Sequence, residues 1–473
     1  MTYSEENNQA ASFILETFQH YWTKPFIEQE KLNSNIGNDK PSALEFFITP
    51  NCNQACNYCY LFKHKNELYP LEIRDNQQIL NNLKIFLEYC LEKKYLYLPY
   101  VDLFSGEIWG YPFGNQIFDT ILEYLKKGLH IKILCIPSNL SFCNSKKLIN
   151  IIQDYIWKFK DYNCSLVFSV SYDGIVIDNL SRPSIDSSIF NKENDEYIDN
   201  MFSFAQKNNF AFHPMISQFG IEHQIENYTE WIKMIKKYWG EQEFKSRYGL
   251  IMQLETREAG WTDEKIIHYL KWLKFLIDTD MKEYFNNDIK NFYENCLKAA
   301  YTGEASFPPT YMPYQIQTMG VDRASCDFGN NLQIRLGDLA LVPCHRTSYK
   351  QFILGRYKVE NNKIIGFQSE NLPLMNSMYM TGLTHKPFCS DCSLGHNCTK
   401  CCFGANFEAN KELFYPEPSN CNLQKAKVIF LINYYRKLKI IDGLPYLLTN
   451  ENNLLQKEPE VYKKWTTIAQ QII

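Results

Sequence analysis

The chain has 473 residues, which is long enough for several domains and a large buried core. Its 49 Lys and Arg residues nearly balance 53 Asp and Glu residues, and no Lys/Arg run stands out, so a nucleic-acid partner is not indicated. The start of the chain is not basic, and no apolar run approaches the ~20 residues of a membrane span. We therefore expect a soluble, cytoplasmic protein with no membrane partner.

The first 300 residues predict a regular alternation of strands and helices. Residues 1–42 are rich in Asn, Gln and Glu and contain one amphipathic helical pattern, at 9–21. Predicted strands cover 44–49, 101–104, 131–136, 166–171, 211–217 and 250–255. Predicted helices cover 75–92, 115–129, 146–159, 196–207, 228–238 and 263–299. Six such units require a parallel sheet with covering helices, and we expect an α/β fold, a TIM-like partial (β/α)6 barrel.

The pattern changes after residue 300. A linker is marked by Pro308, Pro309 and Pro313. The segment from Cys326 to Cys421 is rich in cysteine and has no long periodic pattern of apolar residues, which is typical of small domains whose core is held by metal. The last segment predicts a helix, a turn and a helix. We divide the chain into an N-terminal helical extension (1–42), the partial barrel (43–300), a small Cys-rich domain (301–425) and a helical tail (426–473).

Sixteen cysteines are unusual for a cytosolic chain, and clustered thiols in such a chain indicate metal ligands or catalytic groups. Directly after the first predicted strand, Cys52, Cys56 and Cys59 have the spacing C-x3-C-x2-C. Three thiolates on one loop can ligate three irons of a 4Fe–4S cluster and leave the fourth iron open to a substrate or cofactor. A zinc site with a fourth ligand is the alternative.

This cysteine loop, with Tyr58 before its last cysteine, resembles the signature of the radical S-adenosylmethionine (SAM) superfamily. The resemblance implies that SAM chelates the open iron and is cleaved by the reduced cluster to a 5′-deoxyadenosyl radical. That radical abstracts a hydrogen atom from the substrate, while the protein supplies positioning and excludes water.

Later loops resemble the same family in the expected order. Ser105-Gly106-Glu107 is similar to the Gly-Gly-Glu segment that binds the SAM amino group, with Ser in place of the first Gly and Ile108 in place of the usual Pro. By resemblance, the other residues near SAM are Ser138, Asn139, Ser169, Ser171, Asp173 and Arg182. The alternatives are an ordinary solvated carboxylate for Glu107 and a surface ion pair for Arg182.

Charged residues also follow the last predicted barrel strand. Glu255 and Arg257 are candidate catalytic residues because chemistry in barrels of this kind occurs at the carboxyl ends of the strands. A structural Glu–Arg pair that closes the barrel is an equal alternative.

A second cysteine array resembles the SPASM extension of radical SAM enzymes, which binds two auxiliary 4Fe–4S clusters. By this resemblance, auxiliary cluster I is ligated by Cys326, Cys344 and Cys402. Auxiliary cluster II is ligated by Cys389, Cys392, Cys398 and Cys421. The fourth iron of cluster I has either Asp322 as its ligand or no protein ligand. Cys401 is able to replace Cys402 as a ligand. Structural zinc is again the alternative.

SPASM enzymes mostly modify peptides or proteins, so the resemblance implies a peptide substrate and an electron donor such as flavodoxin or ferredoxin. We expect a maturase of ribosomally made peptides that oxidises, and most simply crosslinks, its substrate. Formylglycine formation on sulfatases is the alternative, disfavoured because His345 stands where that branch has an Asp base. His345 is a candidate base, or else a histidine that only supports a neighbouring group.

A function of another class remains open, namely an iron–sulfur electron-transfer protein or a zinc-binding scaffold. Glu107 and Asp173, which resemble SAM-binding residues of the radical SAM family, argue against such a function.

Overall fold

The computed structural model describes residues 44–93, 96–110, 113–187, 190, 192, 195–241, 254–255, 258–294, 332–371, 392–394, 402–413 and 415–473. Several predictions lie outside these residues: the N-terminal extension 1–42, the proline linker, Arg257, and the cysteines Cys326, Cys389, Cys398 and Cys401. The described residues form two compact units. The first unit contains the described residues of 44–171, 184–210 and 332–371, and the second contains those of 172–183, 211–294 and 392–473.

The first unit contains a mixed sheet built around parallel strands. The parallel strands are β1 (Leu44–Phe47), β2 (Tyr97–Phe104), β3 (His130–Ser138), β4 (Ser165–Val170) and β7 (Leu332–Arg335). Their order across the sheet is β7-β1-β2-β3-β4. The predicted α/β class with a parallel sheet is therefore confirmed at that level, although β2 and β3 are longer than predicted.

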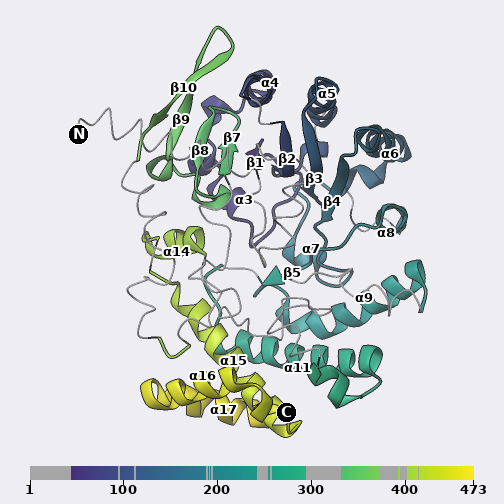
Figure 1. Cartoon of the computed structure of the whole chain (residues 1–473). Helices are drawn as coiled ribbons and strands as arrows, with labels where there is room; N and C mark the ends of the chain where they lie inside the picture. The colour runs from purple at the N-terminus through teal and green to yellow at the C-terminus, as the bar shows by residue number, and fades with distance from the viewer. Residues whose placement is uncertain are drawn as a thin grey trace. The chain divides into compact units, whose positions relative to one another are not determined.

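Helices connect successive strands of this sheet and cover one of its faces (Figure 1). They are α4 (Asn76–Glu92), α5 (Phe113–Lys126) and α6 (Lys146–Lys160), and α8 (Asp195–Asn208) follows β4. Apolar side chains at helical spacing bury this face, as where Phe46 of β1 meets Phe86 of α4 edge to face at 5.5 Å. Successive strand residues point to opposite faces, so Glu45 lies on the other face.

Three antiparallel strands that the sequence did not predict extend the sheet beyond β7. They are β8 (Ala340–Val342), β9 (Gly355–Glu360) and β10 (Lys363–Ser369). The parallel pairing of β7 with β1 joins residues that are 288 positions apart, since Glu45 lies opposite Gln333. Periodicity along the chain carries no information about such a pairing.

The second unit contains a short parallel pair and several helices. The pair is β5 (Met215–Ile216) and β6 (Leu254–Glu255). The helices include α7 (Asp178–Ser181), α9 (Gln224–Trp239), α11 (Asp263–Phe285), α14 (Phe403–Asn410), α15 (Pro418–Lys437), α16 (Pro445–Lys457) and α17 (Pro459–Ile472). The predicted C-terminal helix, turn and helix is confirmed with one more division, because Pro459 begins a third helix.

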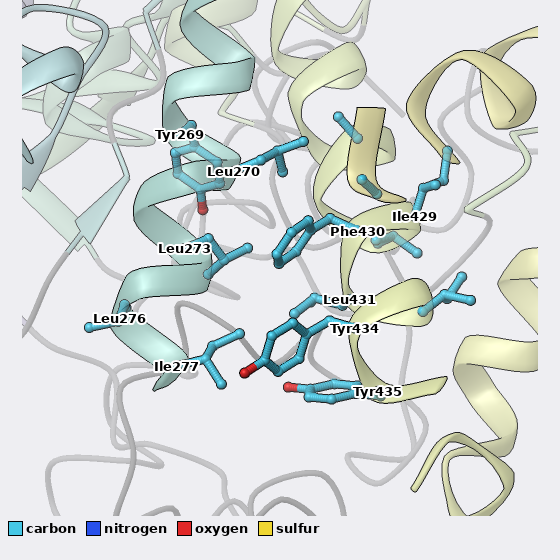
Figure 2. Packing of buried hydrophobic residues seen from close by; sticks show 14 of the residues in the cluster. Tyr269, Leu270, Leu273, Leu276, Ile277, Ile429, Phe430, Leu431, Tyr434 and Tyr435 are labelled. Atoms are coloured by element: carbon cyan, nitrogen blue, oxygen red, sulfur yellow. The ribbon is translucent and has the colours of Figure 1, made fainter. Parts of the chain in front are cut away.

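The core of the second unit lies between α11 and α15. Leu273 and Ile277 of α11 face Phe430 and Tyr434 of α15 (Figure 2). Burial of this apolar surface is the main free energy holding the two helices together. Among the described helices, none has both the length and the apolar character needed to cross a membrane.

Candidate functional site

The three-cysteine loop lies at the carboxyl end of β1. Cys56 and Cys59 close a turn in which the Cys59 amide donates to the Cys56 carbonyl at 2.9 Å, and Cys59 then precedes helix α3 (Tyr60–Leu68). The Gln54 amide lies 3.4 Å from the Cys52 sulfur. The loop is held in place by Ile185, whose amide donates to the Asn53 carbonyl at 3.0 Å. All three cysteines are thiols on one short, ordered loop.

The loop after β2 is hydrogen bonded directly to the cysteine loop. The Gly106 amide donates to the Thr49 carbonyl at 2.7 Å, and the Glu107 amide donates to the Asn51 carbonyl at 2.8 Å. A Cβ atom at residue 106 would lie 2.1 Å from the Asn51 oxygen, so no side chain fits there. This close approach explains the glycine in the Ser-Gly-Glu segment.

Glu107 joins the loops that follow β2 and β3. Its carboxylate is fully buried and accepts hydrogen bonds from the Ser138 hydroxyl at 2.9 Å and the Asn139 amide at 2.8 Å. Asn139 in turn donates from its side chain to the Asn53 side-chain oxygen at 2.8 Å. Glu107 is therefore not a solvated surface carboxylate. In this structure it connects the segments that the sequence predicted to surround SAM.

Other predicted SAM residues of the first unit lie beside this network. Ser169 is on β4, and the Ser171 amide donates to the Ser138 carbonyl at 2.8 Å. Tyr58 is in the turn before Cys59. The buried Ser105 hydroxyl has no hydrogen-bond partner among the described residues. An unsatisfied buried hydroxyl is costly, so Ser105 is a candidate contact for a bound group.

Asp173 and Arg182 belong to the second unit, where both are buried. Asp173 accepts from the Ser181 hydroxyl at 2.6 Å and from the Met215 amide at 2.8 Å. The Arg182 guanidinium lies 3.4 Å from Asp178 and 3.9 Å from Asp173. Burial raises the pKa of Asp173, and Arg182 opposes that rise. The alternative interpretation of Arg182 was a surface ion pair. Arg182 does form an ion pair, but the pair is buried.

The candidate base His345 lies in the first unit, on the short 3₁₀ helix His345–Thr347. Its ring stacks on Phe104 with 4.0 Å between ring centres, and its Nδ1 atom is 2.7 Å from a carboxylate oxygen of Glu45. This carboxylate fixes the orientation of the imidazole. Sequence reasoning missed Glu45, because a carboxylate inside a predicted buried strand gives no signal of its partner.

Tyr60 was also missed. Burial raises its pKa well above the usual value, and the neighbouring thiols of Cys344 and Cys59 raise that pKa further. The Arg346 guanidinium lies over its ring at 4.9 Å. Cys344, which the sequence assigned to auxiliary cluster I, therefore affects the pKa of the same tyrosine hydroxyl as Cys59 does.

The remaining described cysteines of the second array lie in the second unit. Cys392 is in a short described segment, Cys402 precedes α14, and Cys421 is in the first turns of α15. For Glu255 the backbone of β6 is described and the side chain is not. Within the described parts of the chain, no three His, Cys, Asp or Glu side chains are grouped so that they would hold a metal ion.

The donor chemistry of the first loop nevertheless fits an iron–sulfur cluster. Its three thiols come from eight consecutive residues, beside the unpartnered Ser105 hydroxyl and the backbone approach at Gly106. Cys90 in helix α4 is different: burial raises the pKa of its thiol to about 12, so this thiol is inert at neutral pH.

Comparisons with known proteins do not identify a family. No protein-family model matches the chain, and no curated protein matches it. Among solved structures, the chain is similar to the crystal structure of Streptococcus suis SuiB bound to S-adenosylmethionine. The identity is 13%, the alignment covers 84% of this chain and 78% of that chain, and the TM-score is 0.40. A similarity of this size does not place the chain in a family.

Proposed function

We propose that the chain is a radical SAM enzyme that oxidatively modifies a ribosomally made peptide. One observation carries the proposal: the three-cysteine loop, the Ser-Gly-Glu segment and the Ser138-Asn139 segment are hydrogen bonded together at one edge of a parallel sheet. The carboxyl edge of such a sheet is where binding and catalytic loops converge. The sequence motifs and this convergence point to the same edge of the sheet, which supports the proposal.

Each segment has a physical role in this proposal. Cys52, Cys56 and Cys59 would ligate three irons of a 4Fe–4S cluster, which would leave the fourth iron open to SAM. The bound cluster and SAM supply a radical that removes a hydrogen atom from the substrate. Glu107 holds the loops of the site together, and the Ser105 hydroxyl is a donor for the bound SAM.

The second cysteine array supplies the auxiliary clusters of the proposal. Removal of a hydrogen atom leaves a substrate radical, and oxidation is complete only after one more electron leaves. Cys326, Cys344 and Cys402 would ligate auxiliary cluster I, and the remaining array would ligate auxiliary cluster II: Cys389, Cys392, Cys398 and Cys421. Such 4Fe–4S clusters would supply an acceptor for that electron. A separate flavodoxin or ferredoxin reduces the first cluster, and the expected product is a crosslinked peptide.

The decisive experiment measures 5′-deoxyadenosine. Anaerobically reconstituted and reduced full-length protein receives SAM, with and without a small peptide encoded beside its gene, and the peptide is weighed afterwards. We expect deoxyadenosine, together with a peptide that is lighter by two hydrogen atoms. A protein with its full iron content that forms no deoxyadenosine would contradict the proposal and favour an electron-transfer role.

A matched pair of cysteine variants separates the loop thiols from structural thiols. Cys56→Ala should lose the iron of the first cluster and all deoxyadenosine formation, because one of the three ligands of that cluster is gone. Cys90→Ala should keep both, because this thiol is buried in helix α4 and is not one of the loop thiols. Zinc instead of iron in anaerobically purified protein would favour the scaffold alternative.

A further inference from the structure

A row of polar side chains crosses the face of the first unit's sheet that is turned away from α4. We call it the inner row, and it consists of Gln333, Glu45, Asp102 and Cys135. The backbone register pairs Glu45 with Asp102 on one side and with Gln333 on the other, and pairs Asp102 with Cys135. Neighbouring strands are ~4.8 Å apart, and register partners point to the same face. The two carboxyl groups are therefore immediate neighbours.

The two carboxyl groups have different partners. The Glu45 carboxylate accepts a hydrogen bond from the Gln333 amide and contacts the His345 ring nitrogen. Asp102 has one buried oxygen without a hydrogen-bond partner among the described residues. The Glu45 carboxylate thus has two polar partners, Gln333 and His345, whereas one oxygen of Asp102 has none among the described residues.

The other titratable groups around Asp102 are neutral at physiological pH. These groups are Tyr100 on the same strand and Cys135 on β3, and burial raises the pKa of both, that of Cys135 to about 12. Burial also raises the pKa of Asp102 well above its usual value, and the neighbouring charge of Glu45 raises it further. Two adjacent carboxyl groups in such a place cannot both be ionised at low cost.

We propose that Glu45 and Asp102 share a single proton and together form the acid–base group for a substrate bound on this inner face. The position suits the role, since Asp102 is three residues, or about 10 Å, from Ser105 at the edge where the cysteine loop lies. Its side chain is only half-buried on the inner face, as is that of Phe104. His345 then acts as a positioning residue for Glu45.

This inference rests on the proposed function, and the proton balance follows from it. The substrate first loses a hydrogen atom to the SAM-derived radical. Completing the oxidation removes one electron and one proton from the substrate radical. The electron passes to an oxidised iron–sulfur cluster. The proton bonds to the carboxylate of the pair, which then carries two protons and no charge until it returns one to water.

The first test needs no SAM and no substrate. Infrared spectroscopy of the full-length wild-type protein at neutral pH should show the carbonyl band of a protonated carboxylic acid. The band should be absent in Asp102→Asn, and in Glu45→Gln it should titrate at lower pH, because the repelling charge is removed. A wild-type spectrum at neutral pH without a protonated carboxyl band would overturn the shared proton, whether or not either variant folds.

The second test separates this inference from the proposed function. In Asp102→Asn the amount of oxidised peptide formed per deoxyadenosine should fall about 100-fold, as expected for loss of an acid–base group. When product formation by Asp102→Asn is measured against pH, the profile should also lose the limb that ionisation of the Glu45–Asp102 pair produces in the wild type. Equal product from wild type and Asp102→Asn would overturn the acid–base role and leave the radical SAM proposal intact. Absence of deoxyadenosine from the wild type itself would overturn both.

Discussion

At the scale of single residues, Asp102 shows how a local sequence can conceal a chemical property. The segment Tyr97–Phe104 contains one acid among apolar and aromatic residues, which fits an ordinary strand with one polar position. In the folded unit this acid lies beside Glu45, and burial and that neighbour raise its pKa. The unusual property comes from the neighbour and the burial.

This raised pKa has a consequence for stability. Above the ordinary pKa of about 3.8, the unfolded chain has released the Asp102 proton while the folded chain still holds it. The folded state then binds more protons, so the free energy of unfolding falls as pH rises. Asp102→Asn removes this titration. Its stability relative to wild type should therefore increase from pH 4 to pH 7, as measured by melting temperature across that range.

The surface variant Glu123→Gln serves as the control of opposite sign, because the hydrogen bond with Lys127 lowers the pKa of the exposed Glu123 instead of raising it. Its stability relative to wild type should therefore not increase as pH rises. If the stability difference between Asp102→Asn and wild type decreased with rising pH, the raised pKa of Asp102 would be wrong.

At the scale of elements, the loops after β1 and β2 act as one structure. Gly106 is the point of closest approach, because a Cβ atom there would overlap the Asn51 carbonyl oxygen. We expect Gly106→Ala to cost ~1–3 kcal/mol of stability, as overpacking typically does, and to lower the iron content of the reconstituted protein. Melting temperature and iron per chain measure the two effects.

The chain offers a matched control for this glycine. Gly366 on β10 has no atom within 4 Å of an added Cβ, so Gly366→Ala should leave both quantities close to wild type. Similar losses in the two variants would show that the contact between the loops does not support the cysteine loop.

At the scale of the whole molecule, the second unit depends on the apolar packing of α11 and α15. Leu273 is fully buried between these helices (Figure 2). Leu273→Ala should reduce stability by ~2–5 kcal/mol, the usual cost of a large-to-small change in a core. Thermal unfolding of the full chain measures it. Leu455 of α16 is 47% exposed, and Leu455→Ala is the control. Equal shifts would mean that this core does not limit stability.

Much of the local structure was predictable because it is encoded locally. Helical periodicity and capping residues determine α4, where Asp75 accepts from the Gln78 amide at 2.8 Å, and the prediction of 75–92 is close to the observed Asn76–Glu92. The alternation of strands and helices predicted the parallel sheet for the same reason. The cysteine spacing indicated the chemistry of the first loop.

The sequence by itself thus determined the order of most strands and helices, the parallel sheet and the thiol-rich loop, since each depends on residues close together in the chain. Only the tertiary structure decided that β7 lies beside β1, that Glu107 joins three loops, and that Glu45 and Asp102 are neighbours. Strand pairing over hundreds of residues depends on the free energy of the whole fold. The charge state of a buried group depends in turn on that pairing.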